Sequence, residues 1–427
     1  MNLADVRRAR DDRGLTARLP LPRSFRASTQ PELLVRPSRL AVLALSIVSP
    51  LRLAAQRTDA PPAHSFTGVP ALNFDADEGF GYGGVLQYHD YGAGAERPYR
   101  YMLQPAVLFT TRGRRDAVLF ADAPHLLAGG WRLTALVARE QQLATPFYGL
   151  GNDTDADPAM VSSSNPYFYR YGRTVLRANV DVQHALGHPA LRGVAGVGVR
   201  HVDLRAVPYD RGTTLLAQTL GNAPAALSSH SARVGLVWDT RDREIGPTRG
   251  SWIEVLAQAV SSPAAGYGAY TRLTTTARHY APLSHALTFA QRVVVQNVHG
   301  DAPVTELSLL QSSYRDDEGL GGASTLRGIP QNRYQGKGIA LANAELRWEA
   351  LRGEVHGTPA RLIVTGFADA GRVWESGIRI SELATALHAS GGAGMRVGLG
   401  PSFIAGADVG HSAQSAAATY VVLGYAF

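Results

Sequence analysis

Hydrophobic and polar residues alternate one by one along much of the chain beyond residue 55. The pattern is clearest in 175–184, 231–239 and 339–348, where apolar residues alternate with arginines, acids and amides. Successive side chains of a β-strand point to opposite faces of the sheet, so a period of two predicts strands. The sequence therefore predicts an all-β fold.

Turn-forming residues divide this pattern into sixteen candidate strands. Their ranges are 66–74, 79–91, 99–111, 116–123, 131–143, 170–185, 191–206, 229–240, 251–261, 267–281, 286–298, 339–351, 360–369, 391–399, 402–410 and 418–427. The long gaps at 144–169, 207–228, 299–338 and 370–390 alternate with short ones. An even strand number, with short turns at one end and long loops at the other, is typical of bacterial membrane barrels.

The alternation alone fits two arrangements. A soluble sandwich buries its apolar face, whereas a membrane barrel turns that face to lipid and encloses the polar one. The candidate strands match the ~9–11 residues of a tilted membrane span. Aromatic residues near strand ends are typical of interfacial belts; here they are Tyr99, Tyr101, Tyr167, Phe168, Tyr169, Tyr171, Trp348 and Tyr425. We predict a 16-stranded antiparallel transmembrane β-barrel.

The net charge is concentrated in the first 55 residues. The whole chain has 42 basic and 35 acidic residues, a net +7. Residues 1–55 hold 10 of the basic and 4 of the acidic residues, so the rest carries 32 against 31, a net +1. This balance removes the main argument for a nucleic-acid partner. The absence of cysteine excludes disulfides, thiolate metal sites and cysteine nucleophiles.

The same segment has the features of an export signal. Arg36 and Arg39 precede an apolar core at 40–49, and 53–55 offers a small-residue cleavage site. The core is too short to cross a bilayer of ~30 Å as a helix; the alternative is a short buried helix. The predicted organisation is an N-terminal extension with a cleaved signal peptide (1–55), a short periplasmic lead-in (56–65) and the barrel (66–427).

Four segments carry a resemblance to one protein family. Residues 238–250 contain Trp-Asp-Thr-Arg-Asp and Pro-Thr-Arg-Gly, 321–329 read Gly-Gly-Ala-Ser-Thr-Leu-Arg-Gly-Ile, 366–371 read Gly-Phe-Ala-Asp-Ala-Gly, and 423–427 read Leu-Gly-Tyr-Ala-Phe. In this order they resemble the hairpin, loop-six, strand and C-terminal motifs of the BamA/TamA family, also called bacterial surface antigens. The residues that match are Asp239, Arg241, Asp242, Pro247 and Gly250 in the hairpin, and Leu423, Tyr425 and Phe427 in the C-terminal barrel signal. Segment 147–154 also recurs in relatives.

The resemblance implies that loop six folds back into the barrel lumen and is latched there. Its Arg327-Gly328 pair would lie against Asp369 and Glu345, two acids on lumen-facing strand positions. The residues support this reading, because glycine permits unusual backbone angles and a forked guanidinium orients well between carboxylates. Ile329 stands where the family usually has Phe or Tyr, so aromatic packing is lost at that point.

Two functions of different classes follow. The first is an assembly or translocation factor that inserts or transports outer-membrane proteins through a weak seam between the first and last strands. The second is a passive or plugged pore, suggested because the family's periplasmic polypeptide-transport-associated (POTRA) domains are not found in the sequence. Either way, we expect a place in the bacterial outer membrane among its lipids. The expected partners are client outer-membrane proteins or a separate periplasmic protein, and no nucleic acid.

No catalytic site, cofactor or metal is expected, and the protein is not predicted to be an enzyme. Asp153, Asp155 and Asp157 have the opening spacing of a calcium loop. Pro158 and Ser164 stand where that loop requires Gly and Glu, so we expect a solvated loop instead.

Overall fold

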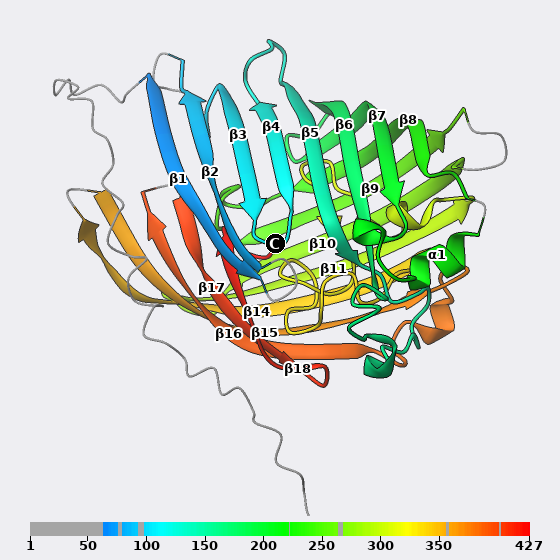
Figure 1. Ribbon diagram of the computed structural model, residues 1–427. Coiled ribbons are helices and arrows are strands. Elements are labelled where there is room, and N and C mark those ends of the chain that lie inside the picture. The colour runs from blue at the N-terminus through cyan, green and yellow to red at the C-terminus, as the bar shows by residue number, and fades with distance from the viewer. Residues whose placement is uncertain are drawn as a thin grey trace, which may run out of the picture. The chain divides into compact units, whose positions relative to one another are not determined.

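The computed structural model describes residues 63–75, 79–92, 98–221, 223–263, 268–355, 358–400 and 403–427. Within these ranges sixteen strands form one antiparallel sheet whose hydrogen-bonded neighbours follow chain order from β1 to β18. The sheet curves round so that β1 and β18 come near one another (Figure 1). The predicted all-β fold with sixteen antiparallel strands is confirmed.

The bounds of the elements are as follows. The large sheet contains β1 (His64–Asp75), β2 (Gly79–Asp90), β3 (Tyr101–Thr110), β4 (Arg115–Ala123), β5 (Trp131–Pro146), β6 (Arg170–Ala185), β7 (Leu191–Arg205), β8 (Ala226–Asp239), β9 (Gly250–Ser261), β10 (Tyr270–Pro282), β11 (Leu287–Gly300), β14 (Gly338–Val355), β15 (Thr358–Trp374), β16 (His388–Leu399), β17 (Phe403–Ser412) and β18 (Ser415–Leu423). The connections hold the hairpin of β12 (Leu309–Leu310) and β13 (Asp317–Glu318), the helix α1 (Leu215–Leu220), and the short 3-10 helices η2 (Pro158–Met160), η3 (Pro208–Asp210), η4 (Val304–Glu306) and η5 (Ile380–Glu382).

Each predicted segment overlaps one observed strand, and the main disagreement is at the end of the chain. We expected the last strand to run to Phe427, but β18 ends at Leu423. Gly424 has a φ of +81°, which leaves the extended conformation and redirects the backbone. At the other end, β1 begins at His64, inside the predicted lead-in.

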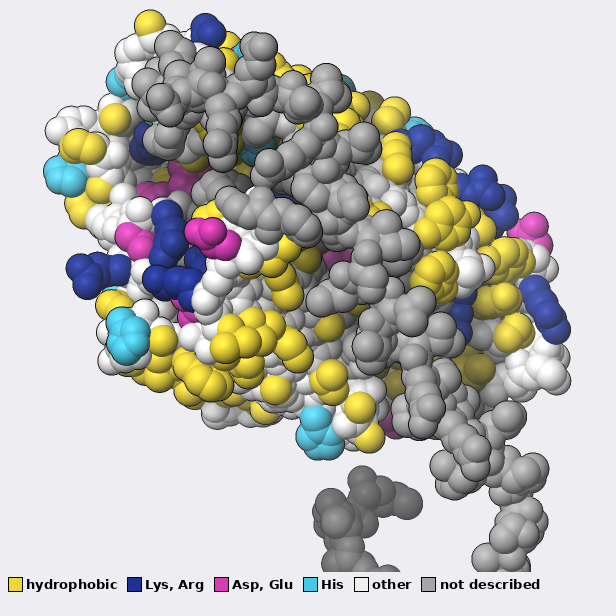
Figure 2. Space-filling model, turned by 90° about the vertical axis from the view of Figure 1, so that its left-hand side faces the viewer, with side chains coloured by type: hydrophobic (Ala, Val, Ile, Leu, Met, Phe, Trp, Pro, Cys, Tyr) yellow, Lys and Arg dark blue, Asp and Glu magenta, His cyan; other side chains and the backbone are white. Residues whose placement is uncertain are grey.

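The strands bury polar side chains and expose apolar ones. On β14, Glu345 and Arg347 are 1% and 4% exposed, whereas the intervening Leu346 and the following Trp348 are 47% and 51% exposed. Hydrophobic side chains gather in broad groups on the surface that Figure 2 shows. A soluble sandwich would have the reverse pattern, and a lipid-facing barrel requires this one.

The connections differ in length at the two ends of the sheet. One end, called the turn end, has the connections 91–100, 124–130, 186–190, 240–249, 283–286, 356–357 and 400–402. The other, called the loop end, has the four longest connections, 147–169, 206–225, 301–337 and 375–387. The longest of all, 301–337, is loop six, drawn in yellow within the curve of the sheet in Figure 1.

The expected aromatic belt is only partly present. Trp348 faces outward, but Tyr99, Phe168 and Tyr171 are at most 4% exposed, so their assignment to a belt was wrong. Tyr99, for example, donates its hydroxyl hydrogen bond to Asp122 at 2.7 Å, inside the sheet. A position near a strand end therefore does not by itself place an aromatic side chain at the lipid interface.

No helix within the described ranges is long and apolar enough to cross a membrane. The predicted export segment, 1–55, and residues 56–62 of the predicted lead-in lie outside the described residues.

Candidate functional site in the barrel lumen

The side chain of Arg327, in loop six, is buried among carboxylates from three strands. Its Nε and Nη2 donate to the two oxygens of Asp369 on β15, both at 2.9 Å. Its Nη1 donates to Glu345 on β14 at 2.6 Å and lies 3.4 Å from Asp408 on β17. Forked bonds to a carboxylate fix both the position and the orientation of a guanidinium. The structure thus brings together the residues expected to form the latch and adds Asp408.

The strand motif on β15 explains how loop six is seated. Phe367, Asp369 and Gly371 lie two residues apart, so all three face the lumen. The guanidinium carbon of Arg327 lies 3.6 Å from the centre of the Phe367 ring, a close cation–π contact. A Cβ on Gly371 would lie 2.9 Å from the Ala340 carbonyl oxygen of β14 and 3.1 Å from Leu320 of loop six, so the glycine gives room to both. Each position of the motif therefore has its own contact with the loop.

Gly328 places the loop-six backbone directly against the last two strands. It has a φ of +97°, and a Cβ there would lie 2.8 Å from the carbonyl carbon of Gly410 on β17. Its N–H donates to the Tyr420 hydroxyl on β18 at 3.0 Å, and its carbonyl accepts from the Ser412 hydroxyl on β17 at 2.6 Å. A Cβ on Gly410 would in turn lie 2.6 Å from the carbonyl carbon of Arg327. Close packing of two backbones requires glycine on both sides.

Asp408 is the carboxylate that the sequence reasoning missed. It accepts bonds of 2.9 and 2.8 Å from Nη1 and Nη2 of Arg396 on β16, and both side chains are buried. The sequence feature that could have indicated Asp408 is an acid between two glycines, Gly406 and Gly410, on the polar face of the predicted strand 402–410.

The hairpin motif forms the turn between β8 and β9. Asp239 accepts bonds of 2.9 and 2.8 Å from Nε and Nη2 of Arg241. Asp242 accepts two backbone N–H bonds from the far side of the turn, at 2.9 and 3.2 Å. Pro247 is buried, and Gly250 has a φ of +99° with a Cβ position 2.2 Å from a carbonyl oxygen of the turn. The motif residues thus fix the shape of this turn.

The same turn reaches other parts of the wall. Glu244 accepts bonds of 2.9 Å from both Nη atoms of Arg132 on β5. Arg132 also donates to both oxygens of Asp122 on β4, at 2.8 and 2.7 Å. A Cβ on Gly246 would lie 3.2 Å from Ile404 on β17. The turn therefore extends across the turn end of the lumen, from β5 to β17.

Residues 118–406 match the Omp85 superfamily domain. The chain belongs to the Omp85 superfamily. Two solved structures have a similar fold. BamA from Haemophilus ducreyi lacking POTRA domains 1-3 has a TM-score of 0.53 and 14% identity, over 85% of this chain and 70% of that chain. CdiB from Escherichia coli has a TM-score of 0.54 and 12% identity, over 84% of this chain and 62% of that chain.

These identities establish the fold alone, and no curated protein matches the chain. The resemblance drawn from the motifs is confirmed by the superfamily match. The protein is accordingly an outer-membrane β-barrel of the Omp85 superfamily.

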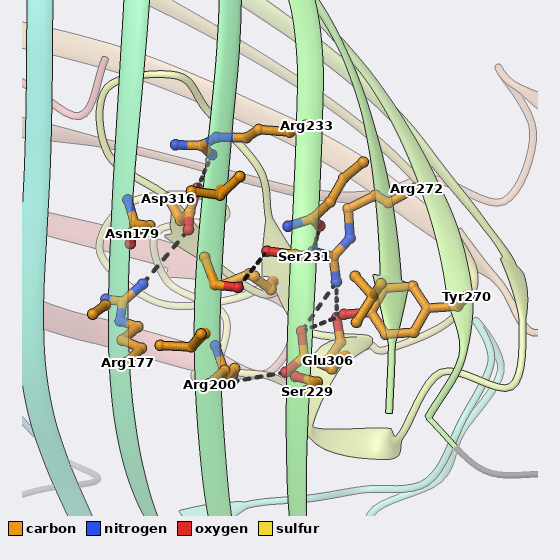
Figure 3. Close-up of a pocket in the computed structure, with 17 residues that line it drawn as sticks. Arg177, Asn179, Arg200, Ser229, Ser231, Arg233, Tyr270, Arg272, Glu306 and Asp316 are labelled. Atoms are coloured by element: carbon orange, nitrogen blue, oxygen red, sulfur yellow. Dashed lines mark hydrogen bonds and ion pairs between the residues drawn. The ribbon is translucent and has the colours of Figure 1, made fainter. Parts of the chain in front are cut away.

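Loop six of this Omp85 barrel is also tied to the wall opposite the latch. Four arginines of β6, β7, β8 and β10 line a small cavity and point toward two loop-six acids (Figure 3). Glu306 lies 2.8 and 3.4 Å from two of them, and Asp316 lies 3.5 and 3.8 Å from the others. The two arginines beside Glu306 are Arg200 and Arg272, and the two beside Asp316 are Arg177 and Arg233. Pairs of opposite charge therefore attach loop six to the barrel wall here as well as at the latch.

Two acids of loop six have altered proton affinity. Burial opposes ionisation of Glu318, but the charge of Arg173 outweighs it and lowers the pKa of Glu318 to about 2. Burial likewise opposes ionisation of Glu306, yet Arg200 and Arg272 bring the net pKa of Glu306 below its usual value. Both acids therefore stay ionised, and bound to the wall, at neutral pH.

Apolar packing completes the seat of the loop. Ile329 is 2% exposed in a cluster that includes Leu320, Leu326 and Tyr334 of the loop together with Ile339 of β14. An aliphatic side chain thus fills the position where the family usually has an aromatic one, and Tyr334 supplies a ring to the same cluster.

Segment 147–154, to which the sequence reasoning gave no role, fastens loop six at the loop end. The N–H of Gly151 donates to the carbonyl of Gln335 at 2.8 Å, and Nη1 of Arg333 donates to the Thr154 hydroxyl at 2.7 Å. Asn152 accepts from the backbone N–H of Val373 on β15 at 3.1 Å. The sequence feature that could have indicated this segment is its pair of glycines, Gly149 and Gly151. Both adopt a positive φ in the structure.

Only the first of the predicted C-terminal signal residues lies in a strand. Leu423 ends β18, whereas Tyr425 and Phe427 lie in the lumen beside Arg347 of β14. The predicted strand does not continue to Phe427, because Gly424 redirects the backbone inward. Their role as an assembly signal stays a prediction.

Proposed function

We propose that this Omp85 barrel inserts or transports proteins at the outer membrane by opening a seam between β1 and β18. These strands are the two ends of the sheet order, and their Cα atoms come within 8 Å. Within the described residues no ladder pairs join them, whereas every other neighbouring pair of strands in the sheet is hydrogen-bonded. An unpaired strand edge offers N–H and C=O groups that can template a client strand.

The observation that carries the proposal is the bond between loop six and the seam. Gly328 donates to Tyr420 of β18, and Arg327 next to it is fixed by three buried carboxylates. The latch would hold β18 in place and release it when loop six moves. Barrels of this superfamily work in membrane-protein insertion or secretion. The proposed partners are client outer-membrane proteins or a separate periplasmic protein, and the proposal needs no catalytic residue, cofactor or metal.

A disulfide across the seam tests this function. Since the chain has no cysteine, pairs placed along β1 and β18 will be the sole thiols. We expect oxidation to stop insertion of a client barrel into liposomes and reduction to restore it. A pair at Ala259 and Thr271, partners on β9 and β10, is the control and should leave insertion unchanged. Full insertion by the seam-locked protein would falsify the proposal.

The second candidate is a plugged pore, which the double attachment of loop six favours. Arg327 binds one wall of the lumen and Glu306 the other. In a planar bilayer, Arg327→Ala should then raise the conductance per molecule. An unchanged conductance would argue against a plugged pore.

A further inference from the structure

The cavity between loop six and the lumen face of β6–β10 is large enough for a small ligand (Figure 3). Its volume is about 60 Å³. A cavity of ~10–15 Å³ already holds one water, so this one has room for a few waters or for one small ion. Four guanidinium groups and two carboxylates line it, so its lining carries a net charge of +2.

At one end of the cavity, Arg200 and Arg272 share a single carboxylate. Oε1 of Glu306 lies 2.8 Å from Nε of Arg200, and Oε2 lies 3.4 Å from Nη2 of Arg272. Oε2 also accepts from the Tyr270 hydroxyl at 2.8 Å, so both oxygens of the carboxylate have partners. Two cations and one anion leave a net charge of +1. We call this the arginine end of the cavity.

The other end of the cavity has no surplus of positive charge. Arg177 lies 3.0 Å from Glu140. Arg233 donates two hydrogen bonds to Asp181. Asp316 lies near both arginines, so three carboxylates there accompany two guanidinium groups. An anion that enters the cavity is therefore attracted to the arginine end.

Donor groups at the arginine end have no partner within the part of the chain that the structure describes. Nε of Arg272 makes no hydrogen bond there, although this side chain is 1% exposed. Neither Nη atom of Arg200 makes one, and neither does the hydroxyl of Ser229, the cross-strand neighbour of Arg200 on β8. Buried donors without an acceptor are costly, so this end of the cavity lacks an acceptor that these groups require.

We propose that the arginine end binds one free oxyanion of the size of phosphate, which links loop six to β7, β8 and β10. Its oxygens accept from Arg200, Arg272 and Ser229, the groups left without partners. Guanidinium forks match the geometry of such oxyanions, and the ion neutralises the surplus charge beside Glu306. Loop six is then held more firmly at its start. The inference does not depend on the proposed function, because the site exists whether or not the seam opens.

Hydrogen exchange of 301–310 in the full-length barrel in detergent, at constant ionic strength, tests for the site. Inorganic phosphate should slow exchange saturably, by about tenfold when its concentration is ten times the measured dissociation constant. Chloride should have little effect, because one spherical ion cannot offer separate oxygens to all three groups. Glycerol phosphate should also protect less, because the cavity fits one small ion. Equal slowing by chloride would reveal charge screening without a site, and equal slowing by glycerol phosphate would overturn the choice of a free ion.

Two variants block the site in different ways. Ser229→Leu keeps both arginines and fills the arginine end, and Arg200→Gln removes one of the charges. Both should lose the saturable slowing by phosphate and the broadening of the phosphate ³¹P resonance by the barrel. The matched controls are Ala232→Leu on β8 and Arg205→Gln on β7, two exposed positions that should keep both effects. Heat-dependent gel mobility verifies that each barrel is folded. Full phosphate protection in either folded blocking variant would refute the assignment.

Discussion

At the scale of single residues, the lumen holds a compact set of opposite charges. Arg327, Arg347 and Arg396 face Glu345, Asp369 and Asp408, and each of these side chains is at most 4% exposed. Burying one charge costs several kcal/mol, and only complete pairing offsets that cost. The set is balanced at three against three, so the loss of one member leaves buried charge without a partner.

Arg327→Ala should therefore destabilise the barrel by about 3–5 kcal/mol, the usual cost of breaking a buried pair. Arg327→Lys should recover part of this loss, because it restores the charge without the fork. Urea unfolding in liposomes, followed by tryptophan fluorescence, measures both. Arg352→Ala removes an exposed ion pair with Glu349 and should leave the free energy of unfolding nearly unchanged. Equal losses for Arg327→Ala and Arg352→Ala would show that the latch adds no stability.

Glu318 gives the loop an acid-sensitive contact. Its pKa of about 2 in the folded protein lies below the ~4.3 of an unfolded Glu. A lowered folded pKa adds stability that is present above pH ~4.3 and is lost as the pH falls toward 2.

Hydrogen exchange of β12 and β13 should therefore accelerate as the pH falls from about 4.3 to 2, after correction for the intrinsic rate. Glu318→Gln should show weaker protection already at pH 6 and a smaller change with pH. Glu354→Gln, on the exposed end of β14, should behave like the unsubstituted chain. An identical pH profile for Glu318→Gln would remove Glu318 from this role.

At the scale of elements, loop six is positioned by close contact of backbones as well as by charge. Gly328 and Gly410 lie so close that a Cβ on either would be within 2.8 Å of the other segment's backbone. Real Cβ atoms do not approach backbone atoms this closely, so a side chain at either position must displace the loop or the strand.

Gly328→Ala should therefore free the tip of loop six from β17 and β18. It combines this clash with a φ of +97°, which is unfavourable for alanine. We expect faster cleavage of loop six by added protease, at least tenfold, in the folded barrel. Gly353→Ala is the control, because a Cβ there meets nothing within 4 Å. Unchanged cleavage in Gly328→Ala would mean that the loop is held without this contact.

At the scale of the whole barrel, two segments cross the lumen at different depths. Loop six bonds to the walls from the loop end, and the turn 240–249 spans the turn end through Glu244 and Arg132. A path through the lumen would meet these two obstacles in series, and opening one leaves the resistance of the other.

The conductance of Glu244→Ala and of Arg327→Ala in planar bilayers should thus each rise modestly. The double variant should rise by more than the sum of the single ones, because both series resistances are then removed. Arg352 is exposed and pairs with Glu349, so the conductance of Arg352→Ala should match that of the unsubstituted chain. A double variant that conducts no better than the better single variant would disprove two obstacles in series.

The local sequence was sufficient to predict the strands. Alternation along 339–348 predicted the faces of β14 correctly, since the pleat fixes the side of every residue once one is placed. The turn residues predicted the long connections as well, including loop six. The motif resemblance placed Arg327, Asp369 and Glu345 in one set, and the structure brings them into contact.

Tertiary structure alone decided which distant groups share that lumen. Tyr420 and Glu244 have no unusual local signal, because the residues that they bond, Gly328 and Arg132, lie far away in the chain. The inward path of 424–427 also depends on distant residues. Gly424 permits the bend, but the buried arginines of three other strands determine where the segment lies. Strand periodicity is a property of neighbours in sequence, so the sequence alone determined the sixteen strands and their two faces. Sheet curvature brings remote residues together, so the pairing of charges inside the barrel depended on the fold.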